Sequence, residues 1–344
     1  MDPLQPIFFD NHTEAGSPGR LAHTESCTKY GSLGPIADVA LAGPDMSAPV
    51  PTRRTHSFRP AIAVALGVIL AVLFGNVGSA HASWKNLAGI FVSAAASSPL
   101  PPAVTDPRAL DRMAPQQQAE TLLELAVGNS DGALEQISLR LGGWRGKITW
   151  TSQFATLAAS ALNSNDLRVR EAGIEIELAA YGLDKNSFSV DSVAKDADSP
   201  DHARKVWALW ALGLLANRGV DAPHITQILT AHLNDTDEDS RRWAIEGLAL
   251  VGAPSTIPVL LRTMHDDPSA AVRERAACSL AESGMLTHEQ RLMAVPQLLV
   301  YTDDPALDAK THTWAFQALS DITHQHLPND SATWRAWYAS YMSN

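Results

Sequence analysis

Small and large apolar residues recur at four-residue steps in five separate stretches of the chain, each with polar positions between them. Residues four apart lie on one face of an α-helix, and a small first residue lets a neighbouring helix approach closely. The five triplets are Ala172, Ile176 and Ala180; Ala208, Leu212 and Ala216; Ala244, Leu248 and Gly252; Ala276, Leu280 and Gly284; and Ala315, Leu319 and Thr323. Their first residues are 32 to 39 residues apart, which indicates an internal repeat.

Each of these predicted helices follows a polar turn and a second apolar-periodic stretch. The turns read NSND at 163–166, DSPD at 198–201, NDTDED at 234–239, DDPS at 266–269 and TDDP at 302–305. Asp and Ser side chains in such turns accept hydrogen bonds from the free amides of a helix start. The repeating unit is therefore helix, short turn, helix. One pair cannot bury its apolar face alone, so consecutive pairs must stack into a solenoid.

The repeat signature is clearest in one unit, which contains Asp267, Pro268, Val272, Arg273, Ala276, Leu280 and Gly284. This spacing resembles the HEAT-repeat family, especially the bacterial form related to lyase HEAT-like repeats. The unit with Arg241, Ala244, Leu248 and Gly252 matches next best. The resemblance implies an all-α fold, an armadillo-like α-solenoid of stacked HEAT repeats. It also implies a long surface for other proteins, and only rarely an enzyme.

Composition supports helices and argues against nucleic acid as a partner. The chain is 45% hydrophobic but only 6% aromatic, with abundant alanine, which favours close-packed helices over a sheet core. Its formal net charge of -11 offers no basic surface to a phosphate backbone. Nucleic acid is therefore not expected as a partner, and the resemblance to HEAT repeats implies another protein, of unknown identity.

The segment before the repeats has the pattern of a secretory signal. Arg53, Arg54 and Arg59 precede a charge-free apolar stretch over 61–77, and Ala80-His81-Ala82 follows it. We expect cleavage after Ala82 and export to the periplasm or cell envelope. The alternative is an uncleaved transmembrane anchor formed by residues 60–82.

The remaining boundaries follow from composition. Residues 1–45 carry six acidic residues against two basic ones, and we interpret them as a disordered extension or as a wrongly assigned start, with Met46 as the true first residue. The signal peptide or anchor then covers 46–82, a flexible Ala/Ser/Pro linker 83–115, and the solenoid 116–327. Residues 328–344 predict a C-terminal capping helix that covers the end of the stack, with Ser331 as its N-cap and Trp334, Trp337, Tyr338 and Tyr341 on one face.

Candidate partner-binding residues lie just before each core alanine of the repeat. Trp207, Trp243, Arg275 and Trp314 occupy this position, and Trp210 lies one helical turn after Trp207. Equivalent positions stack in a solenoid, so we expect Trp207 and Trp243 to be neighbours. One interpretation is packing between repeats. The other is a binding groove, because tryptophan and arginine commonly anchor interfaces.

A second candidate contact is the stretch LGGWRGKI at 141–148. Its three glycines make a core helix unfavourable, so Trp144 and Arg145 are expected either in an exposed contact loop or in a simple linker.

Basic residues recur three positions before the core alanines, as Lys205, Arg241 and Arg273. We expect them to pair with turn acids such as Asp235 and Asp267 in a ladder between repeats, rather than to form an anion site.

Catalytic patterns are weak, so we expect no enzyme, no cofactor and no metal. Only His288-Glu289 has the His-Glu form that HEAT-like di-iron hydroxylases use several times, and a metal shared by His312, His324 and His326 is a remote alternative. Cys278 is expected to be a small, half-buried residue rather than a nucleophile. Cleavage after Ala82 would remove Cys27, its one potential disulfide partner.

Two functional hypotheses remain. The first is a non-enzymatic exported scaffold for protein–protein interaction. The alternative is an accessory lyase-like or chaperone-like module that holds a small ligand or a client in the solenoid groove.

Overall fold

The computed structural model describes residues 107–343, and every regular element within this range is helical. The predictions for the N-terminal extension, the signal or anchor segment and most of the linker concern residues outside this range. The helices are α2 (Pro107–Asp111), α3 (Pro115–Val127), α4 (Ala133–Trp144), α5 (Ser152–Leu162), α6 (Leu167–Ala180), α7 (Ser187–Ala197), α8 (His202–Asn217), α9 (Ala222–His232), α10 (Glu238–Val251), η2 (a 3₁₀ helix, Pro254–Thr256), α11 (Ile257–Asp266), α12 (Ala270–Ala281), α13 (His288–Leu292), α14 (Val295–Tyr301), α15 (Ala309–Thr323) and α16 (Ser331–Ser343).

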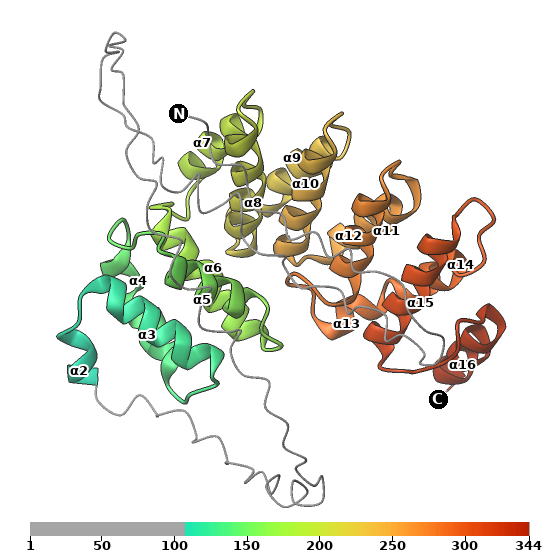
Figure 1. Ribbon diagram of the computed structural model, residues 1–344, viewed down its shortest axis with the longest axis horizontal. Coiled ribbons are helices and arrows are strands. Elements are labelled where there is room, and N and C mark those ends of the chain that lie inside the picture. Colours follow the sequence, from blue (N-terminus) through green and yellow to red (C-terminus); the bar gives the residue numbers. More distant parts are fainter. Residues whose placement is uncertain (1–106, 344) are drawn as a thin grey trace, which may run out of the picture. The chain divides into compact units, whose positions relative to one another are not determined.

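The helices form consecutive antiparallel pairs, of which α7/α8, α9/α10, α11/α12 and α14/α15 follow one another along the chain (Figure 1). The second helices of these pairs, α8, α10, α12 and α15, pack directly on one another, and we call them the second-helix row. The first helices mainly contact second helices and hardly touch each other. The predicted all-α solenoid of stacked helix pairs is confirmed.

The second helix of each pair begins after a polar capping residue, as the sequence predicts. Each begins after an Asp or Ser whose side chain accepts a hydrogen bond from a backbone amide in the first helical turn. The capping residues of α6, α8, α10, α12 and α15 are Asp166, Asp201, Asp237, Ser269 and Asp308. The last cap lies beyond the predicted TDDP turn, so the connection before α15 is longer than expected.

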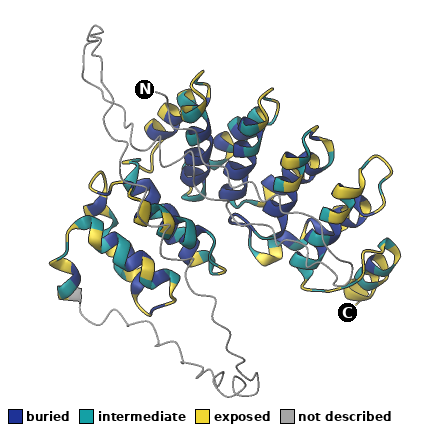
Figure 2. Ribbon diagram, in the orientation of Figure 1, coloured by how far each residue is buried: buried dark blue, intermediate teal, exposed yellow. Residues whose placement is uncertain are grey.

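The buried apolar side chains form two hydrophobic clusters. Figure 2 colours the buried residues of each helix dark blue. The larger cluster contains most of the apolar residues of α7 to α15 together with Trp334. The smaller one joins α2, α3, α4 and α5. Helix α6 contributes to both, because Ile174 packs in the larger cluster and Ile176 in the smaller one.

Two glycines let α8 and α10 meet backbone to backbone. A Cβ atom added to Gly213 would lie 2.6 Å from the carbonyl oxygen of Gly247, and one added to Gly247 would lie 2.5 Å from that of Leu209. No side chain larger than hydrogen fits at this crossing. This contact fixes the spacing of the second-helix row at its centre.

The C-terminal helix α16 packs on α14 through a single buried residue, Trp334. The side chain of Asp330, rather than the predicted Ser331, accepts the hydrogen bond from the first turn, at 2.8 Å from the Thr333 amide. Tyr341 is half exposed and stacks on Trp337, with ring centroids 5.4 Å apart.

No helix between residues 107 and 343 combines the length and apolar character needed to cross a bilayer.

Candidate functional site

The predicted tryptophan line lies on the second-helix row, but its contacts differ from the expected ones. Trp243 pairs with Trp210 rather than with Trp207, edge to face, with ring centroids 5.9 Å apart. Trp210 and Trp243 are buried, whereas Trp207 and Trp314 are half buried against the larger cluster. Trp207 instead contacts Tyr181 at the end of α6, at 5.6 Å. The row therefore holds two packed tryptophans and two that retain exposed surface.

Arg275, the arginine on this line, has an intramolecular partner that sequence reasoning missed. Its guanidinium bonds to both carboxylate oxygens of Glu246, with Nε 2.6 Å from Oε1 and Nη2 2.7 Å from Oε2. Both side chains are nearly buried, so the pair joins α10 to α12. One feature of the sequence could have indicated this pair. Glu246 lies two residues after the core alanine of its repeat, the same position that Trp210 has in the preceding repeat. On α10, which carries Glu246, the Arg242 guanidinium lies over the Trp243 ring, 5.5 Å from the ring centroid.

A buried carboxyl lies at the α6–α8 contact. Trp210 Nε1 donates to Glu177 Oε2 at 2.9 Å, and Glu177 is fully buried. Burial raises the pKa of Glu177 to about 8, and the hydrogen bond from Trp210 only partly opposes this. Burial and the nearby Glu177 charge raise the pKa of Tyr181 well above its usual value. Sequence reasoning missed this group, since an isolated glutamate within a helix gives no pattern to detect.

The predicted basic ladder is confirmed. Lys205 Nζ lies 2.8 Å from Asp235, and Arg241 binds Asp267 through two hydrogen bonds of 2.9 and 3.1 Å. Arg273 continues the ladder to Asp308, at 2.6 Å. Each basic side chain thus reaches from one second helix to the turn before the next.

Trp144 is not in an exposed loop, whereas Arg145 is exposed in the turn that follows α4. Helix α4 continues through both adjacent glycines to Trp144, which is buried and donates from Nε1 to Gln118 Oε1 at 2.7 Å. Arg145 forms an ion pair with Asp184. Up to Trp144 the structure therefore differs from both the contact-loop and the linker interpretation, because tertiary packing overrides the weak helix propensity of glycine, while the exposed turn at 145–147 agrees with the predicted lack of a core helix.

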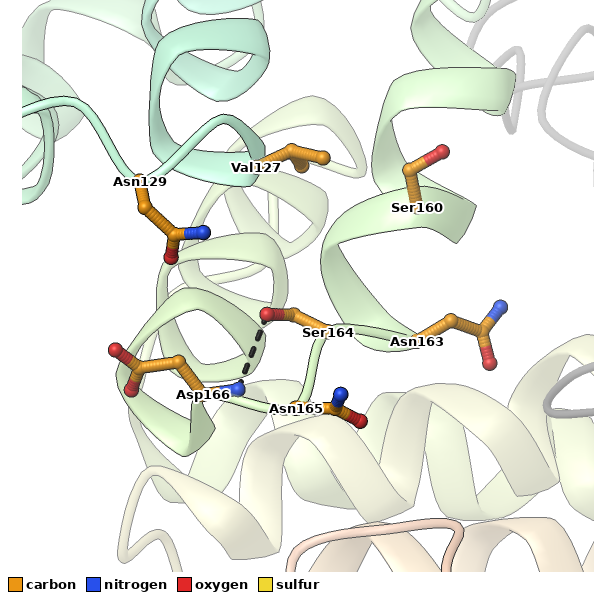
Figure 3. A pocket seen from close by; sticks show the side chains of 7 residues that line it. All are labelled: Val127, Asn129, Ser160, Asn163, Ser164, Asn165 and Asp166. Carbon is orange, nitrogen blue, oxygen red and sulfur yellow. Dashed lines mark hydrogen bonds between the residues drawn. The ribbon is translucent and has the colours of Figure 1, made fainter. Parts of the chain in front are cut away.

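An open, polar pocket of about 540 Å³ lies between the α3–α4 and α5–α6 turns (Figure 3). Its polar groups are largely used by local structure: Ser160 donates to the Thr156 carbonyl at 2.8 Å and Asn163 to the Ala159 carbonyl at 2.9 Å. The Ser164 hydroxyl accepts from the Asp166 amide at 3.1 Å, drawn as a dashed line in Figure 3. These side chains end one helix and begin the next instead of converging on a ligand.

Two further open pockets flank α11, with volumes of about 580 and 420 Å³. The first lies towards α9 and the second towards α14, and they share Arg262 and Asp266. Neither includes a tryptophan of the second-helix row.

The histidines proposed as alternative metal ligands are separated. His312 Nε2 donates to the Asp304 carbonyl at 2.8 Å, whereas His324 stacks on His288 with ring centroids 5.3 Å apart. Within residues 107–343, no three His, Cys, Asp or Glu side chains are arranged to hold a metal ion. Cys278 is buried and disulfide-bonded, so it offers no free thiol; Cys27 lies outside the described range.

Comparisons with known proteins address the repeats. A family model of HEAT repeats matches residues 190–281 and, in an overlapping alignment, residues 222–320. A search of curated proteins gives no match. Among solved structures, the chain is similar to an engineered protein crystallised by the Northeast Structural Genomics Consortium, at 17% identity over 61% of this chain and 90% of that one, with a TM-score of 0.30. That likeness is too distant to support an argument about this chain.

Proposed function

We propose that the chain is a HEAT-repeat scaffold that binds another protein through its second-helix row, and the family model of HEAT repeats that matches residues 190–320 supports this. In this proposal it acts by binding and not by catalysis. Helical repeats of this kind present extended surfaces built from several consecutive units.

The observation that supports this proposal is the placement of Trp207 and Trp314. Both lie on the second-helix row and are only half buried, although large apolar side chains favour full burial. Tryptophan is among the residues that contribute most to binding energy at protein interfaces. The buried Trp210–Trp243 and Glu246–Arg275 contacts hold the helices between them in fixed register.

Site-specific photocrosslinking in the host tests this function. A photoreactive phenylalanine replaces Trp207 or Trp314 in separate variants, and Phe188, an exposed aromatic residue on the first helix α7, is the matched control position. We expect positions 207 and 314 to trap one and the same protein and position 188 not to trap it. A broad set of unfolded chains at 207 and 314 would instead indicate the chaperone-like alternative. Identical products at all three positions would overturn the assignment of the binding surface.

We also propose that the chain is exported, on the support of the signal-like pattern at 46–82. Intact-mass analysis of the protein from fractionated host cells tests this. We expect a soluble exported chain that begins at Ser83. A membrane-bound chain that retains residues 60–82 would support the anchored alternative. A full-length chain in the cytoplasm would contradict export.

A further inference from the structure

The contact between α6 and α8 is a weak point in an otherwise close-packed stack. Helix α8 packs against α10 along most of its length, with backbone contact at Gly213 and Gly247, but it meets α6 over a much smaller area. The two hydrophobic clusters also divide at α6. The connection to α7 starts with Gly182, whose φ of +68° is in the left-handed region that favours glycine. We call this contact the α6–α8 joint.

Two buried polar atoms at the joint, Glu177 Oε1 and the ring Nε1 of Trp150, have no hydrogen-bond partner among the described residues. The Tyr181 hydroxyl and the ring Nε1 of Trp207 have only each other as partners. The four residues are brought together by ring contacts of Tyr181 with Trp150 and Trp207, at 5.0 and 5.6 Å, and by the influence of Glu177 on Tyr181. Buried polar groups are rarely left without partners, because the loss of hydration is costly.

Among residues 107–343, no cation acts on the buried carboxyl. Burial raises the proton affinity of Glu177, and the hydrogen bond from Trp210 is the one side-chain contact that lowers it. Neighbouring charged groups are engaged elsewhere. On α8, Arg218 lies 3.5 Å from Glu171 and 3.7 Å from Glu175.

The other charged groups near the joint are also paired with different partners. On α6, Arg170 donates to the backbone carbonyls of Ser164, Glu282 and Gly284. On α10, Glu246 is paired with Arg275. An ionised Glu177 would therefore be a buried charge with a single hydrogen bond, which is strongly unfavourable.

We infer that the α6–α8 joint is a proton-controlled hinge: the neutral form of Glu177 keeps it closed, and opening to water lets the carboxyl ionise and stabilises the open form. Most of α3–α6 belongs to the smaller hydrophobic cluster and most of α7–α15 to the larger one, so opening must separate Ile174 and Leu178 of α6 from the larger cluster and break the Arg170 bonds to Glu282 and Gly284. This hinge does not depend on the identity of any partner.

The pH dependence follows from the two protonation states. In the closed joint the pKa of Glu177 is about 8, against an ordinary value of 4.5. A raised carboxyl pKa favours the closed form at low pH, and this advantage is lost as the pH rises from about 4.5 to about 8. Within this window the ratio of open to closed joint increases by up to about tenfold per pH unit.

Native-state hydrogen exchange at pH 5.5, 6.5 and 7.5 measures this ratio once the intrinsic pH dependence of amide exchange is divided out. In the wild-type protein we expect opening of 174–186 and 204–212 to increase about a hundredfold over these two pH units. The Glu177→Gln variant, which cannot ionise, is expected to show no such increase. Glu171→Gln, on the same helix, is the matched control: it removes the partly exposed ion pair with Arg218 across the joint, so opening should be raised equally at every pH while the hundredfold increase with pH remains.

Three results would overturn the hinge. The first is a wild-type opening ratio at 174–186 and 204–212 that does not change with pH. The second is an increase of the same size in Glu177→Gln. The third is an equal, simultaneous increase in the exchange of the α10 and α12 amides, which would indicate global unfolding. If Glu177→Gln does not fold, acrylamide quenching of tryptophan fluorescence in the wild type provides a second measurement. Quenching should rise from pH 5.5 to 7.5 as the rings at the joint become accessible, and unchanged quenching would reject the proposal.

Discussion

Arg241 and Asp267 illustrate how single side chains connect consecutive repeats. Their carboxylate–guanidinium contact is bidentate, and the two side chains are only 9% and 4% exposed. The same arginine donates to the carbonyls of Asp235 and Thr236, so it also fastens the turn of its own repeat. Side-chain hydrogen bonding to Asp267 raises the pKa of Arg241 above its ordinary value.

Replacement of Arg241 by alanine tests this connection. Asp267 would then be a buried charge without its cation, and we expect a loss of about 3 kcal/mol in the free energy of unfolding, measured by urea denaturation. Arg204→Ala is the matched control. Its ion pair with Asp196 is largely exposed and should contribute less than about 1 kcal/mol. Equal losses in the two variants would show that burial of the Arg241–Asp267 pair is unimportant.

At the scale of helices, close packing of the second-helix row depends on small residues at the crossings. The core alanines and the Gly213–Gly247 contact allow neighbouring backbones to approach. The alanine pattern was visible in the sequence because it repeats with the helical period. The glycine contact was not, because Gly213 and Gly247 lie outside the repeated triplets and nothing local marks them as partners.

Gly247→Ala should separate α8 from α10. The added Cβ would lie 2.5 Å from the Leu209 carbonyl oxygen and 2.8 Å from a Leu229 methyl group, and we expect a loss of about 2 kcal/mol in unfolding free energy. Gly142→Ala in α4 is the control, since its added Cβ would meet nothing within 4 Å. That variant should gain about 0.5 kcal/mol from higher helix propensity. A tolerated Gly247→Ala would contradict the proposed backbone contact.

At the scale of the whole molecule, local signals predicted the repeats and long-range contacts escaped prediction. Turn acids, caps and four-residue spacing are properties of short segments, so the helix pairs and the basic ladder could be derived from the sequence. Arg170 bonds to backbone carbonyls more than 110 residues away, at Glu282 and Gly284. Any residue supplies such a carbonyl, so the sequence carries no sign of this contact or of the joint beside it.

The central claim is that the second-helix row binds a partner protein. The most direct measurement is calorimetric titration of the protein trapped at positions 207 and 314 against the wild type and the variants Trp207→Ala, Trp314→Ala and Phe188→Ala. We predict that each tryptophan variant weakens binding by at least about tenfold, and that loss of the equally aromatic Phe188 on α7 has no effect. Unchanged affinity in both tryptophan variants, with their folding verified by circular dichroism, would contradict the account.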